Sequence, residues 1–353
     1  MRGNSNSTGS RAPRLSRRAF VRGSGLLVAA TGSGALLASC GKQEPVAGAL
    51  TFLNIVDFTS LTFSPEIFAD AAGYFADQGL DVGFERTRGS AQAIQLVLAG
   101  SAPLTRIGQI EAIGHAANRS VPIMNIGTIV KKSTLRFIST TERPLREPRD
   151  FEGKLFGIPS PGGESEITLD LFLATSGIDP ASVERQVVGY APGVFSLVEE
   201  GRIDAYVVSI DTSHMLAQQR PNVFSLNPGL FISSGAQVYM TSADTLTARE
   251  EDLRKYLEAV EAAVKFMIAD DGFDETLRIM RTKYAFPSLM NTEVAKASLA
   301  EYVDAWTAEG PENVLRTVPS SWQRGYDELV SVGQAAAGKD PARWFTNDLQ
   351  PRA

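Results

Sequence analysis

The sequence predicts an α/β protein of two domains, in which strands and helices alternate, followed by a run of helices. Its 353 residues suit about two domains at the usual 100–200 residues each. Short apolar segments alternate with helical periodicity up to residue 241, a pattern typical of doubly wound parallel sheets. Beyond residue 247 helical periodicity prevails, so a helical layer should complete the fold.

Charge and residue counts narrow the possible classes of protein. The formal net charge is -6, so the chain lacks the basic face that nucleic-acid binding needs, and no nucleic-acid partner is expected. One cysteine allows no internal disulfide, and two histidines, His115 and His214, argue against a multi-histidine metal site. Carboxylate sites stay open, but no metal site and no cofactor is predicted.

Residues 1–39 have the three parts of a signal peptide. A basic region with five arginines is followed by an apolar run at 25–38, which is shorter than the ~20 residues of a membrane span. The segment SRRAFV at 16–21 resembles a twin-arginine export signal. Leu37-Ala38-Ser39-Cys40 resembles a bacterial lipobox, so we expect lipidation of Cys40, a tether at 40–48 and a membrane-anchored lipoprotein on the extracytoplasmic side. The alternative is an unlipidated signal with an incidental cysteine.

The first domain should contain four strands joined by helices. Strands are expected at 50–56, 80–85, 103–107 and 122–129, and helices at 65–75, 91–99 and 111–118. Pro65 suits a first helical turn, Ser90 is a good N-cap, and Gly100 suits the position after a helix. The β-rich segment at 135–140 should then cross into a second domain.

The second domain repeats the alternation. Its strands are expected at 154–158, from 186, at 203–209 and at 223–226, with helices at 164–176, 194–200 and 212–219. The segment 237–241 should return to the first domain, and helices at 250–269, 274–284, 292–307 and 320–337 should pack on it. We therefore assign 49–135 and 242–353 to lobe one and 136–241 to lobe two.

The loop at 159–163 is the first candidate for ligand binding. It follows a strand and opens a helix, and open α/β sheets bind ligands at the C-terminal ends of their strands. The free N–H groups of the helix start favour polar or anionic ligands; the alternative is a plain helix start. The candidates here are Ser160, Gly162, Gly163, Glu164 and Ser165.

Other loops at strand ends supply the remaining candidates, which are Asp57, Phe58, Ser90, Arg106, Tyr190 and Asp211. Arg106 could hold an anion through two hydrogen bonds, or lie on the surface and pair with Glu111 or solvent. Asp57 and Asp211 could bind an amine or amidine, or bond their own backbone in a turn. Ser90 could cap its helix, contact the ligand, or do both. No Gly-x-Ser-x-Gly elbow follows a strand, so no catalytic residue is assigned.

Four segments carry a resemblance to a known family. They are FADAAGYFADQGLDVGFE at 68–85, GSAQAIQLVLAG at 89–100, the strand–loop–helix unit at 148–189 and GRIDAYVVSID at 201–211. The chain resembles solute-binding proteins of ABC importers, in the branch that binds nitrate, sulfonates, taurine and the pyrimidine precursor of thiamine. The resemblance implies the periplasmic binding protein type II fold, with two lobes that close on a ligand. It also implies a monomer with ABC permease and ATPase subunits as partners.

The ligand is less sharply predicted than the family. The branch has an acidic residue after the segment at 89–100, whereas this chain has SAPLTRIGQ with Pro103 and Arg106. Few basic loop residues favour a heterocyclic or aromatic ligand, such as a pyrimidine precursor of thiamine, over a sulfonate-, nitrate- or taurine-type anion. An enzyme resembling the pyrimidine synthases of this scaffold is disfavoured, since it would need clustered histidines and cysteines. Sensing for a membrane receptor is a further alternative to transport.

Overall fold

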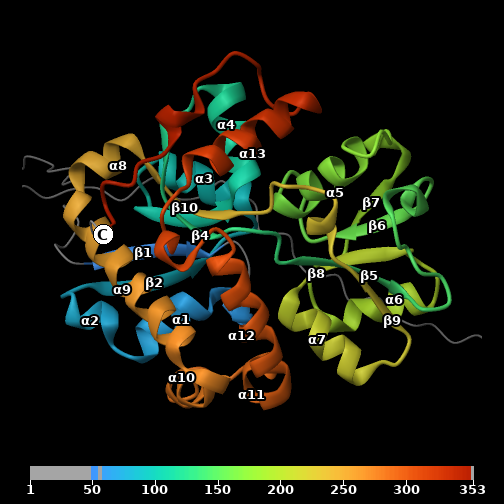
Figure 1. Ribbon diagram of the computed structural model, residues 1–353, viewed down its shortest axis with the longest axis horizontal. Coiled ribbons are helices and arrows are strands. Elements are labelled where there is room, and N and C mark those ends of the chain that lie inside the picture. The colour runs from blue at the N-terminus through green and yellow to red at the C-terminus, as the bar shows by residue number, and fades with distance from the viewer. Residues whose placement is uncertain (1–48, 55–57, 351–353) are drawn as a thin grey trace, which may run out of the picture. The chain divides into compact units, whose positions relative to one another are not determined.

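The computed structural model describes residues 49–54 and 58–350, which form two five-stranded sheets with their helices (Figure 1). The predicted signal peptide, the tether, the lipidation at Cys40 and the candidate Asp57 lie outside the described residues. Within the described part, no helix has the length and apolarity needed to cross a membrane.

The first sheet has the strand order β2-β1-β3-β10-β4. Its strands are β1 (Ala49–Asn54), β2 (Asp81–Arg86), β3 (Leu104–Gly108), β4 (Ile123–Val130) and β10 (Gln237–Ser242). β1 pairs in parallel with β2 and β3, whereas β10 is antiparallel to β3 and β4. The antiparallel strand is the one by which the chain returns from the second sheet.

The second sheet has the order β7-β6-β8-β5-β9. Its strands are β5 (Leu135–Thr140), β6 (Leu155–Ile158), β7 (Glu184–Val187), β8 (Ala205–Ser209) and β9 (Val223–Leu226). β5, which arrives from the first sheet, is antiparallel to β8 and β9. Strand pairing thus corrects two details of the sequence prediction. The sheets are mixed rather than wholly parallel, and 237–241 belongs with the first sheet because its ladder hydrogen bonds lie there.

The helices fall close to the predicted segments. Those before the return strand are α1 (Ser64–Ala71), α2 (Tyr74–Asp77), α3 (Ser90–Leu98), α4 (Gln109–Arg119), α5 (Glu164–Ala174), α6 (Phe195–Glu199) and α7 (Ile210–Gln219). The single helix expected at 65–75 is two helices, because Gly73 has a φ of 82°, a left-handed conformation that ends the first of them. A short 3-10 turn, η1 (Leu61–Phe63), precedes α1.

The C-terminal helices pack on the first sheet, as predicted. They are α8 (Ala243–Ala248), α9 (Glu250–Ala269), α10 (Asp274–Met280), α11 (Pro287–Met290), α12 (Thr292–Thr307) and α13 (Pro319–Ser331). On α9, the ring of Tyr256 stacks on Phe52 of β1 with 5.9 Å between centroids, and Leu257 and Val260 are fully buried. Each such aromatic contact adds about 0.5–1.5 kcal/mol beyond area burial. The stripe of apolar residues along α9 therefore anchors the helical layer to the first sheet.

Candidate functional site

A cavity of about 640 Å³ lies between the two lobes, within the range that proteins use for small organic ligands. The first lobe supplies η1, the loop before α3 and part of β3, whereas the second supplies the starts of α5 and α7. These are the ends of strands and the beginnings of helices, so the cavity lies where the sequence places the cleft.

Most of the predicted site residues line this cavity. They are Ser90, Arg106, Ser160, Gly163, Glu164, Ser165, Tyr190 and Asp211. Gly162 lines a smaller neighbouring pocket instead. Phe58 packs in the core, with ring centroids 4.5 Å from Phe84 and 5.5 Å from Phe63, so its ring is used in packing rather than in lining the cavity. Direct ligand contact stays a prediction for each of these residues.

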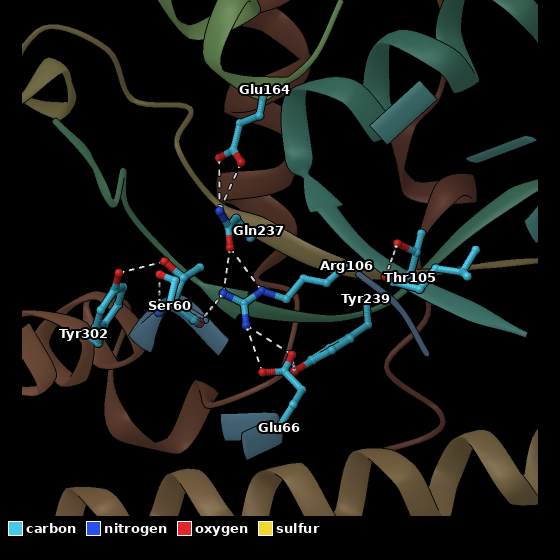
Figure 2. Close-up of polar contacts among 10 residues, drawn as sticks. Ser60, Glu66, Thr105, Arg106, Glu164, Gln237, Tyr239 and Tyr302 are labelled. Atoms are coloured by element: carbon cyan, nitrogen blue, oxygen red, sulfur yellow. Dashed lines mark hydrogen bonds and ion pairs between the residues drawn. The ribbon is translucent and has the colours of Figure 1, made fainter. Parts of the chain in front are cut away.

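Arg106 is a buried residue that is saturated by protein groups (Figure 2). Its Nη1 lies 3.1 Å from both carboxylate oxygens of Glu66, its Nε and Nη2 donate to Gln237 Oε1, and Nη2 also donates to the carbonyl of Thr62 at 2.8 Å. Burial alone would lower the pKa of Arg106, but Glu66 and neighbouring groups raise it overall. The partner of this arginine is thus Glu66, and not the Glu111 or solvent considered from the sequence.

Asp211 joins the two lobes through its carboxylate. It lies in the first turn of α7 and is 2% exposed. Its oxygens accept hydrogen bonds from Ser60 Oγ at 2.9 Å, the Leu61 N–H at 3.2 Å, Ser209 Oγ at 2.7 Å, Ser288 Oγ at 2.7 Å and Tyr302 Oη at 3.3 Å. The backbone turn considered from the sequence is not among these contacts: the local donor, Ser209, uses its hydroxyl group, and the other four donors come from the first lobe. Both carboxylate oxygens are therefore already engaged by protein donors.

Gln237 connects the buried arginine to the cleft. Its Oε1 accepts from Arg106, so its Nε2 is the nitrogen that donates to Glu164 Oε2, at 3.0 Å (Figure 2). Glu164 begins α5 and is 8% exposed. Its burial, and then the nearby charge of Glu111, raise the pKa of this carboxyl to about 8. A chain of polar contacts thus runs from Glu66 in the first lobe to a carboxyl group of the second.

The sequence offered Glu111 only as a partner for Arg106 and missed its place beside the cleft. Glu111 lies in the first turn of α4, where its Oε2 accepts the Gly108 N–H at 3.0 Å. It is 2% exposed, and burial raises its pKa to about 7. A glutamate in the first turn of a predicted helix indicates a residue that caps the helix start. That Glu164 of the other lobe lies beside it could not be foreseen from the sequence.

Hydroxyl groups form much of the remaining cavity wall. Beyond the predicted ligand-binding residues, the wall includes Thr59, Ser60, Thr62, Thr87, Thr134, Thr212 and Ser288. Tyr190 Oη lies 2.8 Å from Ser165 Oγ, and burial raises the pKa of this tyrosine well above its usual range. Arg86 and Arg88 also line the cavity, and both are exposed. The wall thus combines many neutral donors and acceptors with two arginines in exposed positions.

Comparison with known proteins gives the chain a family. The family model described as NMT1/THI5 like matches residues 60–271. The riboflavin-binding protein RibY of Chloroflexus aurantiacus is 23% identical over 297 residues, which is 83% of each chain. A formylaminopyrimidine-binding protein of Halalkalibacterium halodurans is 28% identical over 135 residues, 38% of this chain and 40% of that one.

Solved structures show the fold. The alkanesulfonate-binding protein of Xanthomonas axonopodis has a TM-score of 0.63 at 13% identity, over 87% of this chain and 99% of that chain. The desulfurization enzyme DSZB shares the fold more distantly, with a TM-score of 0.52 at 11% identity, over 85% of this chain and 97% of that one. The predicted fold and branch are both confirmed, and the chain belongs to the NMT1/THI5-like family.

Proposed function

We propose that the chain is the solute-binding component of an ABC importer and that it captures a neutral heterocyclic compound in the cavity between its lobes. The family match and the two relatives named for binding riboflavin and formylaminopyrimidine support a binding role. Both of those ligands are heterocycles, and the cavity of about 640 Å³ has room for a compound of that class.

The observation that carries this proposal is that the buried charges of the cavity are already paired with groups of the protein. Arg106 donates hydrogen bonds to Glu66, Gln237 and a backbone carbonyl, and Asp211 accepts hydrogen bonds from five donors of the protein. An ionic ligand that took the place of a protein partner of Arg106 or Asp211 would leave a buried charged or polar group of the protein unpaired, at a cost of about 3–5 kcal/mol for a charge. Among the buried parts of the wall, neutral hydroxyl groups remain to meet the ligand, and these suit a compound with matching donors and acceptors.

A specific observation also favours a second candidate, an anionic ligand of the sulfonate, nitrate or taurine type. Arg86 and Arg88 follow one another closely at the end of β2 and line the cavity. Guanidinium groups bind sulfonates and carboxylates through paired hydrogen bonds. An anion would then bind toward these exposed arginines and away from the buried Arg106.

Isothermal titration calorimetry with four probes tests the proposal: riboflavin, formylaminopyrimidine, taurine and nitrate. We expect one of the two heterocycles to bind, and at about 100 times its dissociation constant it should stabilise the protein against unfolding by roughly 2.7 kcal/mol. Binding of taurine or nitrate alone would support the anionic alternative. Chemical conversion of a bound heterocycle would instead indicate an enzyme.

We further propose an extracytoplasmic lipoprotein that is anchored through Cys40 and acts as a monomer. The sequence up to Cys40 supports the export and the lipid anchor, since it has the features of an export signal that ends in a lipobox. Fractionation of cells that express the full chain tests the anchor. The wild-type protein should sediment with membranes, whereas Cys40→Ser should be released. Membrane attachment that survives this substitution would contradict the lipid anchor.

A further inference from the structure

We propose that Glu111 and Glu164 form a proton-binding pair between the lobes, so that the lobes come together with uptake of protons and ligand capture weakens as the pH rises. The inference deepens the proposed function and rests on it, because it assigns a pH dependence to the same interlobe cavity.

The two carboxyl groups approach one another from different lobes. Glu111 belongs to the first turn of α4, Glu164 is the first residue of α5, and these helices contact each other. A Cβ atom added to Gly108 would lie 2.8 Å from Glu164 Cγ, and one added to Gly163 would lie 3.6 Å from Glu111 Oε1. Each glutamate therefore rests against the residue that precedes the other helix, and both are buried.

Within the described part of the chain, neither carboxyl group forms an ion pair. Among the described residues, Glu111 Oε1 is buried without a close hydrogen-bond partner, and the groups that favour the charged form of Glu111 are neutral: Ser90 and the backbone of Gly108 and Glu164. The side chain that donates to Glu164 is the neutral amide of Gln237. The nearby guanidinium of Arg106 attracts Glu164 but pairs with Glu66. A buried charge without a partner is costly, and a proton is the simplest means to remove it.

The other titratable groups around the pair do not supply that balance. Tyr190, from the loop after β7, lies near both carboxyl groups, and its own pKa is raised by burial. His115, one turn further along α4, lines the small pocket beside Glu111, together with the exposed Arg119. Burial and the charge of Arg119 lower the pKa of His115, which favours its neutral form.

The direction of the pH effect follows from these environments. With the lobes together, burial raises the pKa of Glu111 to about 7 and that of Glu164 to about 8, whereas solvated glutamates titrate near 4.5. The compact form therefore binds more protons than a form with separated lobes. Its extra stability is complete below pH 4.5 and is lost as the pH rises through about 7 and 8. Each linked proton changes the closing equilibrium about tenfold per pH unit inside that window.

Two measurements test the pair independently of each other. The first is small-angle X-ray scattering of the ligand-free protein at about pH 5 and about pH 8.5, on either side of most of the titration window. We expect a larger radius of gyration at the higher pH. Glu111→Gln combined with Glu164→Gln, which mimics the protonated pair with little change in shape, should stay compact at both pH values. Scattering of the wild-type protein that does not change with pH would overturn the inference.

The second measurement is calorimetric titration with riboflavin in two buffers of different ionisation enthalpy, which reports the protons taken up on binding. The wild-type protein should take up protons at about pH 6 and lose affinity up to about tenfold per pH unit for each of them. The double variant should take up none, and Glu152→Gln, at an exposed position of the second lobe, should behave like wild type. Riboflavin affinity that is equal across the window overturns the inference. Scattering that responds to pH while riboflavin fails to bind supports the pair and removes only the proposed ligand.

A further variant separates this pair from the contact that His214 makes between the lobes. His214 Nε2 on α7 lies 2.7 Å from Glu301 Oε1 on α12. The variant His214→Gln removes the imidazole from this contact and leaves the glutamate pair intact, so it should keep the pH response in scattering. Loss of that response in His214→Gln, with its retention in the double glutamine variant, would assign the effect to the histidine and overturn the proposal.

Discussion

Substitution of Asp211 tests the polar contact between the lobes in which one carboxylate accepts five hydrogen bonds. In Asp211→Asn an amide nitrogen replaces one carboxylate oxygen. It replaces either Oδ1, which accepts from three hydroxyl groups, or Oδ2, which accepts from one hydroxyl group and one backbone N–H. Hydroxyl groups can turn toward another acceptor, but the Leu61 N–H, now 3.2 Å from Oδ2, is fixed by the backbone. One buried donor or amide nitrogen is then left unsatisfied, so the free energy of unfolding should fall by about 1–3 kcal/mol.

The alanine variant extends the same test. Asp211→Ala removes both oxygens and leaves a small void in a buried position, so we expect it to lose more stability than Asp211→Asn, about 2–5 kcal/mol in all. Urea unfolding measures both losses, and Asp81→Asn, at an exposed position of β2, is the matched control. If both Asp211 variants unfolded within about 0.5 kcal/mol of the wild type, the five hydrogen bonds would carry no net stability and the reasoning would be refuted.

Two further substitutions test the interior and the crossovers. Arg106→Met leaves the carboxylate of Glu66 buried without its cation, so we expect a loss of about 3–5 kcal/mol in urea unfolding, and a loss under 1 kcal/mol would mean that the pair is not coupled. Gly235→Ala places a Cβ 2.5 Å from the backbone nitrogen of Ser133, where the two crossover segments touch, and should cost about 1–3 kcal/mol. Gly114→Ala, in open space on α4, should instead gain up to about 1 kcal/mol, and equal effects of the two alanines would contradict the crowding at Ser133.

The order of strands and helices could be predicted from the sequence because it depends on local patterns. Apolar periodicity and capping residues such as Ser90 act within a few residues, and the helices at 250–269 and 292–307 coincide with α9 and α12. The break at Gly73 was missed because a glycine inside a periodic stretch does not by itself reveal a left-handed conformation.

Pairings between distant residues could not be predicted in the same way. Arg106 finds Glu66 on α1 and Gln237 on β10, and nothing in the sequence around an arginine tells which buried carboxylate will reach it. The meeting of Glu111 with Glu164 depends on how two lobes come together. The loops that line the cavity were predicted, since strand ends mark them, whereas the electrostatic state of their side chains depends on tertiary contacts.

Two helices of the second lobe have an acidic residue at their start, and the two acidic side chains differ in the hydrogen-bond donors that tertiary structure brings to them. Glu164 and Asp211 both lie in a first helical turn, where the helix dipole favours negative charge, and both are buried against the first lobe. In the described structure Asp211 is satisfied as an anion by five donors, whereas the carboxylate of Glu164 accepts from Gln237 alone. The contact at α7 is therefore made by hydrogen-bond donors, whereas the proposed contact at α5 requires protonation. The separation of the lobes that we expect at high pH would then begin at α5, where the charge of the glutamate pair opposes the hydrogen bonds of Asp211 at α7.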